Sequence, residues 1–242
     1  MIPLQRPSLD QAVERRLAAR TATLVRDGAT TARARQEWSS AAGIRRQLRA
    51  ALEAMAPGVQ RCMYCGDGQG SSIDHFEPLA RDPLKAFAWV NHLLACTHCN
   101  SNHKRDRFPV DADGHCLLVD PTSEDPAEHL RLVLGTGEYR HRTAKGEATI
   151  DVFGLGRPEL ERGRAAAFVR CRSMLRDLHS LTGPGAGAGD AAEAAAVAAS
   201  LRVQPFADVL HAMRATMDSP GAAIVIGQRE LESLRTLSGR SG

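Results

Sequence analysis

The spacing of apolar and polar positions predicts helices at both ends of the chain and short elements in its middle. Apolar residues recur at helical spacing over residues 9–24, after Ser8 as a candidate N-cap. Helical spacing returns over residues 31–55, with Trp38 on the apolar stripe, and Pro57 follows. The first part of the chain is therefore expected to be helical.

The middle of the chain has short apolar runs separated by turn residues. We expect a turn, a short strand entering residues 73–76, and a loop of about a dozen residues. A helix is expected to begin near Thr97 and to end before Pro109, because proline cannot continue it. The predicted order is strand, strand and helix.

The second half of the chain is predicted to be mostly helical. Residues 117–134 suggest an extended segment followed by a helix from Pro126, residues 143–156 a strand and a turn, and residues 159–181 an amphipathic helix. Residues 201–242 suggest two helices. The expected units are a basic helical N-terminal arm (1–58), a cysteine-bounded core (59–120), a mostly helical extension packed on the core (121–182), an Ala/Gly-rich linker (183–200) and C-terminal helices (201–242).

Composition bounds the class of protein. The chain has 242 residues, and its 43% apolar content is enough for a folded core. Only 4% of residues are aromatic, so a bound metal would be a natural substitute for large buried side chains near the cysteines. Neither an apolar leader nor a run of eighteen apolar residues occurs, which predicts a cytoplasmic protein without a membrane span.

Positive charge is concentrated at the start of the chain. Residues 1–61 hold eleven Arg against five acidic residues, residues 62–120 hold five basic against eight acidic, and residues 121–242 are balanced. An Arg-rich arm beside an acidic centre suits a polyanionic substrate held by its phosphates. A solvated helix face, or an Arg-rich genomic composition, explains the same surplus.

Four of the six cysteines form two Cys-x2-Cys pairs thirty residues apart: Cys62, Cys65, Cys96 and Cys99. In a reducing compartment such pairs are more often metal ligands than disulfides, and four thiolates suit one tetrahedral zinc ion. A Cys3His site using His98 is the less favoured alternative, because both pairs are complete. Cys116 and Cys171 are expected to be inert thiols.

Asp74 and His75 lie between the two cysteine pairs. Phosphodiester hydrolysis needs a cation to neutralise charge and a base to activate water. Asp74 offers a hard oxygen ligand for Mg²⁺ or Mn²⁺, and the imidazole of His75 can take a proton near neutral pH. Neighbours on a strand point to opposite sides, so the strand is expected to end or bend here. Asn91 is expected to fix the loop that carries His75.

Residues after the second pair add further candidates. On a helix beginning near Thr97, Asn100, His103 and Lys104 would share one face, supplying an oxygen ligand, an imidazole and a cation. The basic side chains expected to contact DNA phosphates, with a solvated helix end as the alternative, are Lys104, Arg105 and Arg107.

The order C-x2-C, D-H, N and C-x2-C-N over residues 61–109 resembles the HNH (ββα-metal) nuclease family. The resemblance implies His75 as general base, Asp74 and Asn100 as ligands of a catalytic Mg²⁺ or Mn²⁺, and Asn91 as the residue that orients the base loop. His103 matches a position where some members carry a histidine that touches metal or phosphate. The implied activity is hydrolysis of DNA to 5′-phosphate and 3′-hydroxyl ends.

Further stretches, CNSNHKRDRFP, LLVDPTSEDPAEHL and ATIDVFGLGRPELERGR, resemble HNH proteins of bacterial antiphage systems of the Septu and retron-associated type. That resemblance implies an ATPase as partner. The expected fold class is α+β, with a zinc-stapled ββα-metal HNH core embedded in a mostly helical chain. The alternative is a catalytically inactive, zinc-stabilised module that binds nucleic acid or a partner.

Overall fold

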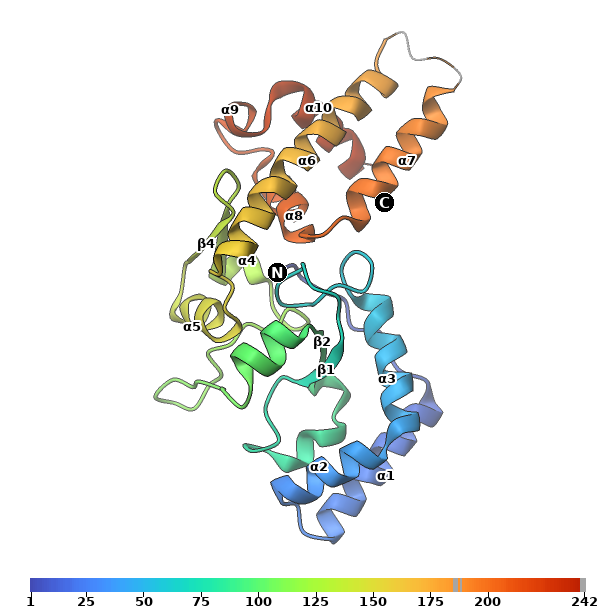
Figure 1. Cartoon of the computed structure of the whole chain (residues 1–242), viewed down its shortest axis with the longest axis vertical. Helices are drawn as coiled ribbons and strands as arrows, with labels where there is room; N and C mark the ends of the chain where they lie inside the picture. Colours follow the sequence, from blue (N-terminus) through green and yellow to red (C-terminus); the bar gives the residue numbers. More distant parts are fainter. Residues whose placement is uncertain (185–186, 188, 240–242) are drawn as a thin grey trace.

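The chain forms an elongated molecule with helical ends and a small sheet at its centre (Figure 1). A computed structural model describes residues 1–184, 187 and 189–239. The N-terminal helices are α1 (Gln11–Arg26), α2 (Thr31–Ser40) and α3 (Ala42–Met55). Strands β1 (Ser72–His75) and β2 (His92–Ala95) follow, joined through the one-turn helices η1 (Pro83–Phe87) and η2 (Trp89–Asn91). Helix η3 (His98–Lys104) comes next.

The N-terminal helices differ from the sequence prediction in two respects. The N-cap of α1 is Asp10, whose side chain accepts a hydrogen bond from the backbone N–H of Ala12, and not Ser8. The single helix expected over residues 31–55 is interrupted at Ala41, which leaves helical geometry with φ −86° and ψ 43°. The hydroxyls of Ser39 and Ser40 donate to backbone carbonyls three residues back, an alternative to regular helical bonding that ends α2.

The central sheet is an antiparallel pair that leads directly into a helix. Ser72 pairs with Ala95 at one end of the ladder and His75 with His92 at the other. Helix η3 starts three residues after β2 and has the wide π form, in which the backbone N–H of Arg105 donates to the carbonyl of Asn100, 2.8 Å away. Strand, strand and helix therefore follow the predicted order.

A second antiparallel pair and a short helix follow the central unit. They are α4 (Pro126–His129), β3 (Leu130–Val133), β4 (Glu138–His141) and α5 (Ala144–Phe153). The strand and turn expected over residues 143–156 are wrong, because this segment is mainly helix α5. Thr143 caps its first turn by accepting from Gly146 N, and Gly154 ends it in the left-handed conformation, with φ +60°.

The far end of the molecule is a bundle around the long helix α6 (Pro158–Thr182) (Figure 1). Helix α7 (Asp190–Val203) packs along α6 and buries Ala194 and Leu201. The alanine-rich half of the predicted linker 183–200 is thus helical, and its small side chains let the two helices approach closely. Residues 185, 186 and 188 of that predicted linker lie outside the described residues.

The C-terminal helices number three within the described residues, where the sequence suggested two. They are α8 (Ala207–Thr216), α9 (Ala222–Ile226) and α10 (Gln228–Gly239). A large core joins the cysteines, β2 and these helices, and a smaller core joins α1, α2 and α3 to the β1–β2 connection. The described residues therefore form a mixed, helix-rich fold with two small sheets. No described helix is long and apolar enough to cross a membrane.

Candidate metal centre and catalytic cleft

Four cysteine sulfurs meet at one end of the central sheet. The ligand atoms of Cys62, Cys65, Cys96 and Cys99 all lie within 4.8 Å of one another, and all four residues are buried. The Cys65 and Cys96 sulfurs are 3.9 Å apart. A tetrahedral zinc ion with Zn–S bonds of about 2.3 Å requires sulfurs about 3.8 Å apart. The cluster could therefore hold zinc, and His98, which is exposed, is not part of it.

The first cysteine pair is shaped by close backbone approaches. The backbone N–H of Cys62 donates to Gly68 O at 2.8 Å, and Gly66 N donates back to Cys62 O at 2.9 Å. Gly66 has φ +69°, and a Cβ on Gly68 would lie 2.9 Å from Cys96 Cβ. Burial raises the pKa of the Cys62 thiol, so a cluster of thiolates here needs a cation to balance its charge.

A cleft of about 210 Å³ opens beside the last residue of β1. It brings four of the sequence-predicted residues together, namely Asp74, His75, Asn100 and Arg105. Helix α2 supplies Arg35 and Trp38 to its wall, so the N-terminal helices complete the cleft. The remaining lining residues are Ile73, Pro78, Leu79 and Asp106.

The ring of His75 is held in one orientation. Its Nε2 is 3.1 Å from the carbonyl oxygen of Ala86, and its face meets the ring of Trp38 edge-on, with centroids 4.6 Å apart. A carbonyl only accepts, so Nε2 carries the proton of the neutral ring and Nδ1 carries a lone pair. Burial lowers the pKa of His75 to about 4. The ring is consequently a neutral base at neutral pH.

Asn91 ties the loop after His75 to the start of β2. Its side-chain oxygen accepts from the backbone N–H of Glu77 at 2.7 Å, and its side-chain nitrogen donates to the carbonyls of Glu77 at 3.0 Å and Lys85 at 3.2 Å. The backbone N–H of Phe76 also donates to Asn91 O at 2.8 Å. One buried amide therefore satisfies three backbone groups of the connection between β1 and β2.

Replacing Asn91 by alanine should destabilise the protein by about 1–3 kcal/mol, because partly buried backbone groups of Glu77 and Lys85 would lose their partners. Urea unfolding followed by circular dichroism measures this change. The matched control is Asn102→Ala, since Asn102 is exposed on η3 and should change stability little. Equal stability of the two variants would contradict the role given to the Asn91 amide.

Asp74 lines the same cleft as His75, but its carboxylate is buried and is held by protein donors. Its Oδ2 accepts from the hydroxyl of Tyr64 at 2.5 Å and its Oδ1 from the ammonium of Lys104 at 3.1 Å. Burial raises the pKa of Asp74, and Lys104 opposes this rise. The side-chain nitrogen of Asn100 donates to the hydroxyl of Ser72 at 3.0 Å. Both oxygens of Asp74 thus already have partners.

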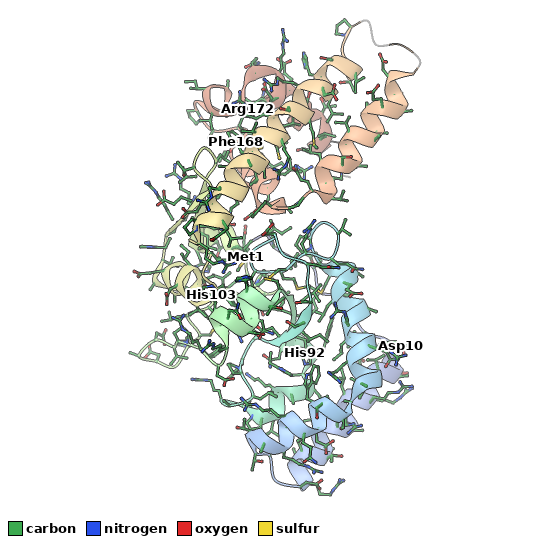
Figure 2. All side chains as sticks on the ribbon, viewed as in Figure 1. Met1, Asp10, His92, His103, Phe168 and Arg172 are labelled. Atoms are coloured by element: carbon green, nitrogen blue, oxygen red, sulfur yellow. The ribbon has the colours of Figure 1, made fainter. Side chains whose placement is uncertain are left out.

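Two predicted residues lie away from the cleft. His103 and Arg107 line a second, more open cleft of about 590 Å³ on the side of α5, where Arg107 forms an ion pair with Asp151. Figure 2 shows His103 on the α5 side of η3 and His92 between the central sheet and the N-terminal helices. The π geometry of η3 explains this placement, because residues three apart no longer stack on one face. The structure does not bring His103 together with Asp74.

The prediction that Lys104 contacts DNA phosphates is wrong. Its side chain is 0% exposed, because its ammonium pairs with Asp74 inside the protein. It cannot reach a phosphate on the surface from this position. Arg105, by contrast, is exposed and lines the cleft that contains His75.

Sequence reasoning missed the aromatic and imidazole neighbours of His75. His92 is 0% exposed, stacks on Trp38 with centroids 4.9 Å apart, and has its Nε2 3.0 Å from the same Ala86 carbonyl. Burial lowers the pKa of His92 well below its usual value. Its position directly after Asn91 was the available signal, because that places it at the start of β2, opposite His75.

Taken together, the fold and site define a helix-rich protein with a buried four-cysteine cluster and a separate small cleft at the end of β1. One curated relative is the Septu protein PtuB of Bacillus mycoides (strain KBAB4), which is 34% identical over 135 residues, covering 43% of this chain and 46% of that protein. Protein ea31 of Escherichia phage lambda is 40% identical over 53 residues, covering 22% of this chain and 18% of that protein. The chain spans less than half the length of either relative.

Neither a protein-family profile nor a solved structure matches this chain. The partial similarity to a Septu protein is therefore the basis for a proposed biological role. The geometry of the cleft is the basis for a proposed reaction.

Proposed function

We propose that this chain is an HNH endonuclease that hydrolyses DNA phosphodiester bonds with a divalent metal, as an effector of bacterial antiphage defence. The observation that carries this proposal is the orientation of His75, whose neutral Nδ1 is left as a base in a cleft shared with Asp74 and Asn100. This cleft is lined by residues of the β1–β2 pair and of the helix that follows it, and the same unit carries a cysteine cluster that could hold zinc.

Within this proposal each residue has a defined task. His75 Nδ1 takes the proton of the attacking water, and the Ala86 carbonyl and Asn91 hold the ring and its loop in place. Arg35 and Arg105, on the rim of the same cleft, contact phosphates of the DNA. Asp74 and Asn100 offer oxygen ligands of the type that Mg²⁺ and Mn²⁺ prefer, and the ion would neutralise charge on the phosphate.

The role in defence rests on the similarity to the Septu protein PtuB. A partner within such a system, an ATPase according to the family resemblance, belongs to the same proposal.

A second function is favoured by one observation. Both oxygens of Asp74 accept hydrogen bonds from protein donors, and Lys104 balances its charge. A zinc-stabilised module that binds nucleic acid without cutting it would keep the cleft in this state.

Incubation of the purified chain with supercoiled plasmid in Mg²⁺, in Mn²⁺ and in EDTA tests the proposal. We expect nicked and linear products in the metal-containing reactions only, with 5′-phosphate ends that DNA ligase can rejoin. Plasmid that is bound but stays supercoiled at every metal concentration would favour the binding module instead.

A further inference from the structure

The carboxylate of Asp74 is already in contact with a cation, which belongs to the protein itself. The ammonium of Lys104 lies 3.1 Å from Asp74 Oδ1 and donates a second bond, of 2.7 Å, to the backbone carbonyl of His75. Tyr64 occupies the other oxygen of Asp74. The buried carboxylate of the cleft is therefore already paired with a positive charge.

This ion pair is unlike the others made by lysine in the chain. Only three of the 31 basic residues are lysines, and the pairs of Lys85 with Glu77 and Lys145 with Glu124 are partly exposed. Lys104 is 0% exposed and Asp74 only 4%. An ammonium is a compact point charge, so it fits a site of the size that one metal ion would take.

A divalent cation that bound Asp74 with Lys104 in place would meet a like charge in a buried setting, where repulsion is strong. We propose that Lys104 is a built-in counter-ion that competes with the divalent cation for Asp74, so that the cation binds only when the Lys104 ammonium leaves. This inference rests on the proposed nuclease function, and it describes how that site is regulated.

The second bond of Lys104 links this competition to the base. Because the same ammonium holds the backbone carbonyl of His75, its departure also releases the end of β1. Cation binding at Asp74 and the backbone position of His75 are therefore coupled through one side chain.

Titration of the zinc-loaded full chain with Mn²⁺, followed by electron paramagnetic resonance, tests the competition without measuring activity. Lys104→Met keeps the length of the side chain and removes its charge, so it should bind Mn²⁺ about tenfold or more tightly than the wild type. Adding Asp74→Asn to that variant should abolish the gain. The matched control is Lys85→Met, which removes a surface charge and should leave Mn²⁺ affinity unchanged.

Equal or weaker Mn²⁺ binding by Lys104→Met would overturn the inference. If this variant does not fold, Lys104→Gln is measured in its place and the same outcomes apply. If neither variant folds, the Mn²⁺ affinity of Asp74→Asn is compared with that of the wild type. An unchanged affinity supports the inference, because Lys104 then keeps the cation from the wild-type carboxylate. Loss of a tight Mn²⁺ site contradicts it. If Mn²⁺ binding contradicts the competition by Lys104, the plasmid-cleavage test of the nuclease function is not affected. If the chain does not cleave plasmid, the nuclease function is wrong, but the measured Mn²⁺ affinities still test the competition.

Discussion

Replacement of His75 by alanine should slow plasmid cleavage by about 10²–10⁴-fold, the usual contribution of a positioned general base. The variant should still fold. The carbonyl of Ala86, which His75 contacts, is also 3.0 Å from Nε2 of the buried His92 and so keeps a donor. Single-turnover cleavage of a supercoiled plasmid in Mn²⁺, at saturating protein, measures the chemical step.

The control for this experiment is His115→Ala. His115 is exposed and lies in a turn outside the cleft, so its loss should leave the rate unchanged. Circular dichroism and zinc content show whether both variants keep the wild-type fold. Should His75→Ala, folded and zinc-loaded, cut at the wild-type rate, His75 is not the base and another group activates the water.

The pH dependence of the wild-type cleavage rate is a second test of His75 as the general base. Because burial lowers the pKa of His75 to about 4, the ring is neutral and able to accept a proton throughout pH 5–8. An ordinary histidine, with a pKa of about 6.5, would lose most of its base form by pH 5.5.

The cysteine cluster could be predicted from spacing alone, because the two ligands of each pair are close together in the sequence. Two residues between each pair of ligands fix a turn, and zinc demands only that the two turns meet. The order of the strands and η3 followed in the same way from short apolar runs. By contrast, the break at Ala41 depends on side-chain hydroxyls that compete with the helix, and hydrophobic spacing does not register it.

Long-range pairing explains the features that the sequence did not reveal. Lys104 looks like a basic residue at the end of a helix, and its burial depends on Asp74, thirty positions away. Trp38 packs on His75 and His92 only because α2 folds over the β1–β2 connection. Similarly, the alanine-rich stretch in α7 has too few large side chains to predict packing, yet the neighbouring α6 provides the surface.

Removal of zinc should unfold the central unit of the protein. The four cysteines lie in the same apolar core as β2 and the C-terminal helices, so this core depends on their being held together. Binding energies of about 10–16 kcal/mol for structural zinc are as large as the whole stability of a typical domain, about 5–15 kcal/mol. We expect the zinc-free chain, and Cys65→Ser, to lose the cooperative thermal transition seen by circular dichroism, with about one zinc per chain in the intact protein.

The matched variant is Cys116→Ser, a half-buried thiol outside the cluster, which should keep both the bound zinc and the thermal transition. Mg²⁺ should not restore the fold of the zinc-free chain, because four thiolates are soft ligands that bind zinc and not a hard oxygen-seeking ion. The zinc content of each sample shows whether a change in the thermal transition follows loss of the metal or only the replacement of one sulfur. A zinc-free chain that melts like the intact one would show that the cysteine cluster does not hold the core together.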